Sequence, residues 1–237
     1  PADCTAHRGT RQPGPTAERL MALTYPLSFT QFLGALRVEE VTFRLSHPQE
    51  HTRLGDGTVI TASLGASLWT GTIRLAQANH PRHAQMEALL ALMDQPGASF
   101  LCHDPRYIGP ASDPTGSVLG SRTVTIHTVT NNMRELRITG LPSGYVLSPG
   151  DMLAFEYGSS PIRYALHRIV VGGTASGTGL SPLLEVVPNL RPGAVAPLPV
   201  SLVRPACKAR LLPDPGYGSG RQAMSRGASF DFIQTLR

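Results

Sequence analysis

Apolar and polar residues alternate over short stretches of this chain, and glycine or proline separates most stretches from the next. Val41, Phe43 and Leu45 alternate with polar residues, which predicts a half-buried strand within residues 36–45. The same pattern predicts a mainly β protein with minor helical content, built as β-barrel or sandwich domains. Further strands are predicted at residues 58–64, 68–75, 99–105, 123–129, 135–139, 152–157, 163–171, 183–187, 198–203, 207–212 and 228–233.

One segment has the periodicity of a helix instead. Its apolar residues recur at i, i+3, i+4 and i+7, so they form a single stripe on one face. The stripe consists of Met86, Leu89, Leu90 and Met93. Pro81 suits the first helical position, and Gln95-Pro-Gly97 ends the segment. We therefore predict one clear amphipathic helix over residues 81–94 that packs on a sheet, with a partner-binding groove as the alternative.

The single tryptophan, Trp69, lies in the predicted strand 68–75. Large aromatic side chains favour strands, where they pack against neighbouring residues on a half-buried surface. We therefore expect Trp69 to lie in the structural core, together with the four apolar residues of the helix, rather than to form a platform for a ligand.

Four parts follow from the distribution of turn residues. Residues 1–24 are polar and interrupted by proline, which predicts an extended N-terminal arm. Residues 25–108 form a first β domain that contains the helix, residues 109–121 a loop or boundary, and residues 122–237 a second β domain. The arm is expected to lie on a neighbouring subunit or to fold back on its own domain. Its assembly contacts are assigned to Arg8, Arg11 and Arg19.

The charged, aromatic and cysteine residues argue against nucleic acid and zinc as ligands. The chain has 237 residues and a formal net charge of +5, and Lys208 is the one lysine among 21 basic residues. The arginines are scattered and aromatic residues make up 6%, whereas nucleic-acid binding favours a basic patch with aromatics. The odd set Cys4, Cys102 and Cys207 contains no CxxC pair, so we expect buried free thiols rather than disulfides or zinc ligands.

No complete catalytic or ligand-binding motif emerges. His80, His83 and Glu87 match no closed zinc spacing. The glycine-rich segment 172–179 lacks the lysine of a phosphate-binding loop. The adjacent Glu39 and Glu40 point to opposite faces of a strand, so they cannot act as an acid–base pair. We therefore predict no enzyme activity, no catalytic, cofactor or metal site, and no cofactor.

The order of these elements resembles minor tail proteins of long-tailed (siphovirus-type) bacteriophages, in particular the distal tail protein class. The resemblance covers residues 36–212: a strand with Trp69, the helix, a loop rich in glycine, and four short motifs. These motifs are Phe-x-x-x-Asp-Pro at 100–105, Leu-Ser-Pro-Gly-Asp at 147–151, Tyr-x-Leu-x-Arg at 164–168 and Glu-x-x-Pro-x-Leu-Arg at 185–191.

The resemblance implies a structural virion component, made in the host cytoplasm and located in the tail. It implies a ring of identical copies, expected to be a hexamer, that connects the tail tube to the baseplate, hub or fibres. DNA passes through such a ring without being specifically bound, and no membrane segment is implied. The alternative function is a β-rich module of the tail that binds carbohydrate or a cell-surface partner.

Overall fold

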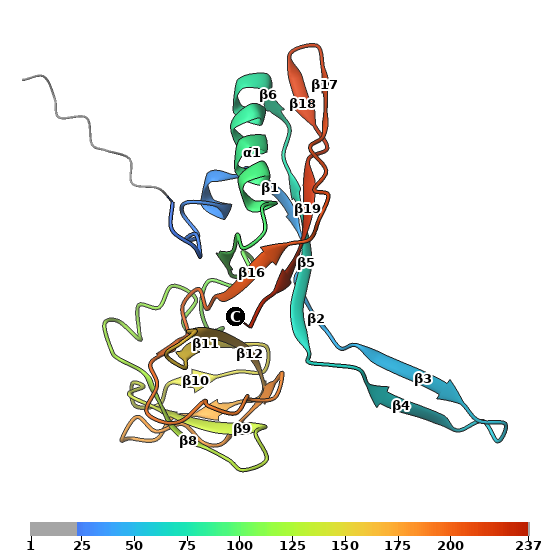
Figure 1. Cartoon of the computed structure of the whole chain (residues 1–237). Helices are drawn as coiled ribbons and strands as arrows, with labels where there is room; N and C mark the ends of the chain where they lie inside the picture. Colours follow the sequence, from blue (N-terminus) through green and yellow to red (C-terminus); the bar gives the residue numbers. More distant parts are fainter. Residues whose placement is uncertain (1–22, 237) are drawn as a thin grey trace, which may run out of the picture.

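The computed structural model describes residues 23–236, and they form two β units that share an interface (Figure 1). The fold is mainly β with one α-helix, and it contains a half-barrel and a nearly closed barrel. The predicted fold class is therefore confirmed.

The first unit is a six-stranded antiparallel sheet in the order β1-β5-β19-β16-β7, with β2 also paired to β5. Its strands are β1 (Val38–Val41), β2 (Arg44–Ser46), β5 (Leu68–Leu75), β7 (Phe100–Cys102), β16 (Cys207–Leu211) and β19 (Ser229–Gln234). β5 alternates buried and half-buried or exposed side chains, because one face of the sheet packs on the core and the other faces outwards.

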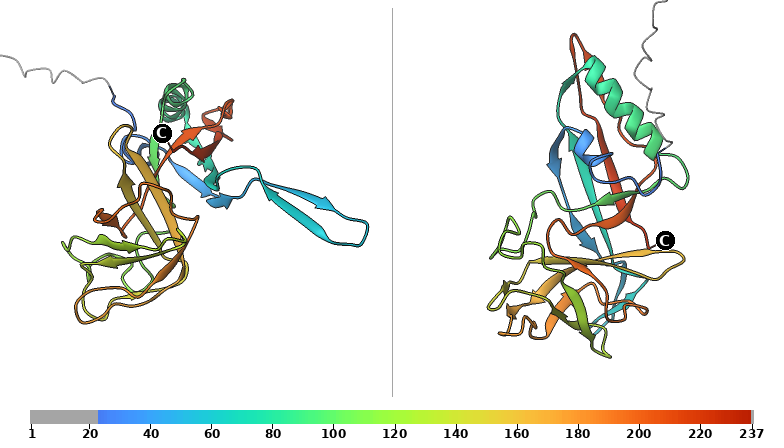
Figure 2. Two further views of the ribbon diagram at one scale, coloured as in Figure 1. Left: turned by 60° about the horizontal axis from the view of Figure 1, so that its bottom comes forward. Right: turned by 90° about the vertical axis from the view of Figure 1, so that its left-hand side faces the viewer.

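The helix α1 (His80–Met93) covers the core face of this sheet (Figure 2). The side chain of Asn79 caps its first turn by accepting a hydrogen bond from the Arg82 amide at 3.2 Å. β6 (Ala78–Asn79) leads into the helix and pairs with β18 (Met224–Arg226), which forms a small sheet with β17 (Ser219–Arg221). A short 3₁₀ helix, Leu33–Ala35, precedes β1.

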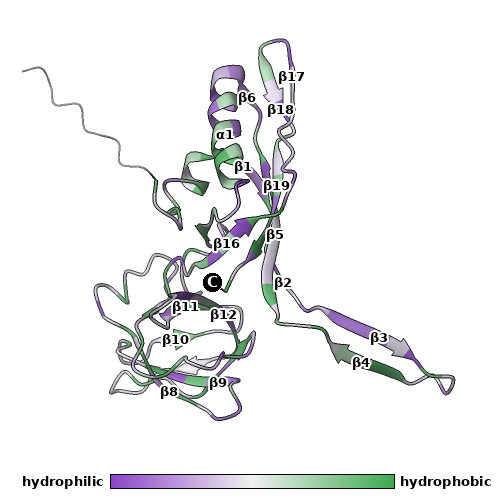
Figure 3. Ribbon diagram, viewed as in Figure 1, coloured by the Kyte–Doolittle hydropathy of each residue, from purple (hydrophilic) through white to green (hydrophobic). Residues whose placement is uncertain are grey.

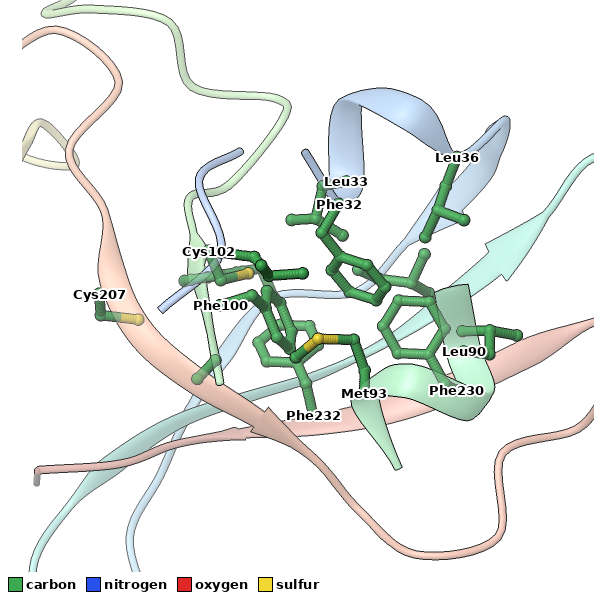
Figure 4. Close-up of a cluster of buried hydrophobic side chains, with 14 of the residues drawn as sticks. Phe32, Leu33, Leu36, Leu90, Met93, Phe100, Cys102, Cys207, Phe230 and Phe232 are labelled. Atoms are coloured by element: carbon green, nitrogen blue, oxygen red, sulfur yellow. The ribbon is translucent and has the colours of Figure 1, made fainter. Parts of the chain in front are cut away.

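The core between helix and sheet contains the predicted apolar stripe (Figure 4). Met86, Leu90 and Met93 are buried, and Leu89 is partly buried against the same cluster. Aromatic rings from four segments complete the packing, with ring centroids 4.7 to 6.5 Å apart. These rings belong to Phe32, Phe43, Phe100, Phe230 and Phe232.

The second unit is a six-stranded antiparallel sheet in the order β15-β11-β12-β14-β9-β8. Its strands are β8 (Thr125–Val129), β9 (Glu135–Thr139), β11 (Met152–Tyr157), β12 (Arg163–Val171), β14 (Leu184–Val187) and β15 (Val200–Ser201). Backbone hydrogen bonds from Ile126 to Leu198 and from Val200 to Val124 join the two ends, so the sheet closes into a barrel around its own core. β10 (Val146–Leu147) pairs separately with β13 (Gly173–Thr174).

The strand pairing differs from the predicted domain boundary, which assigned all of residues 122–237 to the second unit. β16 pairs with β7, and β19 pairs with β5, so the last part of the chain returns to the first sheet. The second barrel is therefore inserted between β7 and β16. Local periodicity predicted these strands as strands but could not show their partners, because pairing depends on residues far apart in sequence.

A second difference lies at residues 36–45, where one predicted strand is divided into β1 and β2. Both pair with β5, and the gap lies at Thr42, whose carbonyl oxygen approaches Gly71 closely. A Cβ at Gly71 would lie 2.0 Å from that oxygen, so only glycine allows this approach. The irregular edge of the sheet therefore depends on the glycine of the facing strand.

We expect Leu90→Asp to prevent soluble folding. Leu90 is fully buried, and burial of an unpaired carboxylate is strongly unfavourable. Ala88→Asp is the matched control, because Ala88 lies on the exposed side of the same helix. The soluble fraction and the circular dichroism spectrum check the result. A soluble, normally folded Leu90→Asp protein would contradict the packing of α1 on the sheet.

Candidate assembly interface

A two-stranded hairpin projects from the first unit and contacts little of the rest of the molecule (Figures 1 and 2). It consists of β3 (Gln49–Arg53) and β4 (Val59–Ser63), and every residue of both strands is exposed. Asp56 and Gly57 form its turn: the Asp56 carboxylate accepts from the Thr58 amide at 2.8 Å, and Gly57 has a φ of +88°. An isolated hairpin is at best marginally stable in water, so this one is well placed to gain stability from a partner.

The two faces of the hairpin differ in polarity. Because side chains alternate along a strand, Ile60 and Ala62 share one face with Thr52 and Glu50, which lie opposite them on the partner strand. Leu54 and Leu64 continue this face at its two ends, and Ile60, Leu54 and Leu64 are exposed by 52%, 44% and 66%. Figure 3 shows the contrast between a hydrophilic β3 and a more hydrophobic β4. Apolar area of this kind on a projection marks a contact surface.

The base of the hairpin is attached to both units. β3 follows β2 and β4 precedes β5 in the chain, so both strands of the hairpin are connected to the first sheet. The Leu64 amide donates to the Pro48 carbonyl at 3.0 Å, and His47 Nδ1 lies 2.7 Å from Ser67 Oγ. Arg191 of the second unit donates to the Ser67 carbonyl at 3.3 Å. These contacts fix the direction in which the hairpin leaves the body.

The first sheet has one covered and one uncovered edge. At β7, Leu27 forms a parallel bridge to Phe100 and exchanges backbone hydrogen bonds of 2.9 Å with Ser99 and Leu101. Among residues 23–236, no strand pairs with the outer edge of β1 and β2. Glu39 and Glu40 of β1 are exposed, and the Glu40 carboxylate forms an ion pair with Arg74 of β5 at 2.8 Å. Charge on an edge strand discourages indiscriminate strand pairing.

Trp69 lies where the two units meet. Its indole N–H donates to the Leu166 carbonyl of β12 at 2.8 Å, and the Arg168 guanidinium lies 5.0 Å from the ring centroid. Gln234 of β19 strengthens the same junction, because its side chain accepts from the Trp69 amide and donates to the Tyr164 carbonyl. Trp69 is therefore a core residue, and it also connects the two β units.

A buried histidine supports the second unit. His167 Nδ1 lies 2.7 Å from the Pro188 carbonyl and donates to it, and its ring stacks on Phe155 with the centroids 5.4 Å apart. Burial lowers the pKa of His167 to about 4, although the bond to Pro188 acts in the opposite direction. The positive charge of Arg191 lowers the pKa further. His167 is therefore neutral at physiological pH.

A crevice of about 440 Å³ lies between the two units and has a mixed lining. Leu101 and Val200 contribute apolar surface, and Glu156, Tyr164 and Arg204 contribute polar groups. The other five tyrosines are not among its lining residues. Tyr145 and Tyr157 are buried and Tyr107 packs against the core, whereas Tyr25 and Tyr217 are exposed and Tyr217 lies near α1. The exposed aromatic cluster that would favour a carbohydrate-binding module is therefore absent from the described part of the chain.

The other residues that the sequence singled out are dispersed. Arg8, Arg11 and Arg19, assigned to the assembly arm, lie outside the described residues, as does Cys4. Cys102 and Cys207 are buried free thiols on paired strands, as predicted, and burial raises the pKa of both, that of Cys207 to about 12.

The two histidines at the start of α1 contact the loop and hairpin that precede β19. His80 bonds to Ser225 and to the Gln222 carbonyl, and His83 lies 2.8 Å from the Tyr217 carbonyl. Within residues 23–236, no three His, Cys, Asp or Glu side chains are arranged to hold a metal ion. These histidines therefore act as structural contacts between α1 and the β17–β18 sheet.

Sequence reasoning predicted β4 as a strand but missed β3 and the hairpin. The signal was present: Asp56-Gly57 lies between two strand-length segments, and Asp-Gly is a frequent hairpin turn. β3 escaped notice because its sequence, Gln-Glu-His-Thr-Arg, has no apolar residue.

Comparisons with known proteins add no assignment: no protein-family model and no curated protein matches this chain. Among the residues that the structure describes, no helix is long and apolar enough to cross a membrane.

We expect Trp69→Phe to lower the free energy of unfolding by about 1–3 kcal/mol. The substitution keeps an aromatic ring but leaves the Leu166 carbonyl without its indole donor. Urea unfolding followed by circular dichroism measures the change. A loss below roughly 0.5 kcal/mol, less than a typical hydrogen bond contributes, would contradict the role of this bond.

We also expect stability to fall as the pH is lowered from 6.5 to 4. The pKa of His167 is lower in the folded chain than its ordinary value of 6.5, so the unfolded chain takes up the proton first. His167→Asn can keep a donor to Pro188 but cannot titrate. Unfolding curves at several pH values should show a shallower loss for this variant than for the wild type. Equal losses in the two proteins would exclude His167 as a cause.

Proposed function

We propose that this protein is a structural subunit of a phage tail, a ring protein of the distal tail protein type that joins the tail tube to the baseplate, hub or fibres. The observation that carries the proposal is the β3–β4 hairpin. All of its strand residues are exposed, and its apolar face finds no cover within the described chain. Such an arm is typical of a protein whose folded form is completed by a neighbour.

The resemblance of residues 36–212 to minor tail proteins supports the same proposal, and so does the architecture. Ring subunits associate head to tail, so they need two different surfaces on one chain, one that reaches out and one that receives. The hairpin and the uncovered edge of β1 and β2 are two such surfaces, and both belong to the first unit.

A rigid body is the other requirement for a ring subunit, because a closed ring fixes the angle between neighbours. Three bonds hold the parts of this chain together. Trp69 and Gln234 bond across the junction of the two units, and Arg191 bonds to the base of the hairpin. These interactions join the two β units and the hairpin into one piece.

We expect the purified protein to form a closed ring, with six copies of the 25.3 kDa chain as the expected number. Mass photometry over a range of concentrations gives the mass of the particle, and negative-stain images give its symmetry. Replacing residues 49–63 by a short Gly-Ser turn should yield a folded monomer. A wild-type chain that stays monomeric at high concentration would argue against the ring.

A further inference from the structure

We propose that the hairpin acts by strand addition: β4 of one copy pairs with the uncovered edge of β1 and β2 on a second copy of this chain. This inference rests on the proposed ring function and specifies the contact that closes the ring. It identifies β4, rather than β3, as the strand that pairs with the neighbour.

The outward-pointing backbone groups of β4 follow from the hydrogen bonds at the two ends of the hairpin. The Leu54 amide bonds to the Thr58 carbonyl, and the Leu64 amide bonds to the Pro48 carbonyl. Bonded and non-bonded pairs alternate in an antiparallel ladder, so the pair His51 and Thr61 is non-bonded. The amide and carbonyl groups of Thr61 therefore point away from β3, towards the free edge of β4.

The side chains of β4 leave this edge unprotected. Natural proteins protect exposed strand edges with charges, proline or bulges. Residues 57–73 include no Asp, Glu, Lys, Arg or His, and β4 reads Val-Ile-Thr-Ala-Ser, a sequence of high β propensity without proline. β3, by contrast, carries Glu50, His51 and Arg53. An edge of this kind is an aggregation hazard unless the assembly covers it.

The receiving edge is available on the same chain. β1 and β2 both pair antiparallel with β5. The hairpin precedes β5 in the chain and leaves this sheet at an angle (Figure 1). In a ring, the rotation between neighbouring copies changes the direction of β4 relative to this edge, and the proposed contact requires the rotation that lays β4 along β1 and β2. The uncharged β4 also lets Glu39 and Glu40 approach without repulsion.

The second copy is favoured over a different protein because both halves of the joint lie on this chain. The two larger sheets offer no other open edge among the described residues, because the second barrel closes on itself and Leu27 covers β7. The other open edges include the outer side of β3, which carries charged side chains, and that of the short strand β17 in the small sheet. The donor strand and the receiving edge are different surfaces, so they form a head-to-tail contact between copies. Such a contact closes into a ring when the rotation from one copy to the next adds up to a full turn.

Two proline substitutions test the donor strand. Thr61→Pro removes an outward amide of β4 without removing a bond to β3, and it should abolish the ring and leave a folded monomer. His51→Pro is the matched control, because it removes the corresponding outward amide of β3 and should leave the mass of the particle unchanged. Circular dichroism confirms folding of both variants.

Cysteine cross-linking tests the receiving edge. In a chain with Cys4→Ser, Glu39→Cys is mixed with Val59→Cys, Thr61→Cys or Ser63→Cys, and the mixture is oxidised. We expect an inter-chain disulfide in at least one mixture and in none of the single variants. No cross-link in any mixture would overturn the receiving edge.

The outcomes separate this inference from the proposed function. If the wild type and Thr61→Pro form equal rings, strand addition through β4 is wrong and the ring function stands. If His51→Pro alone disrupts the ring, β3 is the pairing strand and the inference is also wrong. If the wild type never self-associates, the ring function itself fails.

Discussion

Every β-sheet edge must be paired, covered or protected, and this constraint shapes most of the molecule. The second unit meets it by closing into a barrel through the backbone bonds between Ile126 and Leu198 and between Val200 and Val124. The first sheet meets it at β7, where Leu27 lies along the strand. Among the described residues, the edges without a partner strand include the outer edge of β1 and β2, the hairpin that follows β2, and β17 of the small sheet. The functional proposal rests on the first two of these.

Trp69 gives this arrangement its rigidity. β5 pairs with β1 and β2 on one side and with β19 on the other, and it carries the indole that bonds to β12 of the second unit. The same strand follows β4 in the chain after the short connection 64–67. The bonds from Trp69 to Leu166 and from Arg191 to Ser67 therefore connect β5 and the base of the hairpin to the second unit. A ring subunit needs this continuity, because small changes in the angle between neighbours decide whether a ring closes.

The sequence predicted the parts of the fold that depend on local periodicity. The stripe of α1 and the alternation in β5 predicted both elements and their buried faces correctly, because packing on one face imposes a regular period. The return of β16 and β19 to the first sheet escaped prediction, because alternation predicts that a strand forms and not which strand it joins. The hairpin escaped for a different reason: β3 is polar on both faces, so it shows no alternation, and its existence depends on its partner β4.

Local periodicity also cannot locate the proposed interface, because it does not show whether a predicted strand is buried or exposed. Residues 58–64 read as an ordinary strand in the sequence, and an ordinary strand with this composition would lie in a core. The structure places it in solvent, with Ile60 and Leu64 more than half exposed. Natural chains are locally consistent with their final surroundings, and within residues 23–236 nothing covers the apolar side chains of β4. This mismatch between composition and environment is the physical reason for proposing a partner.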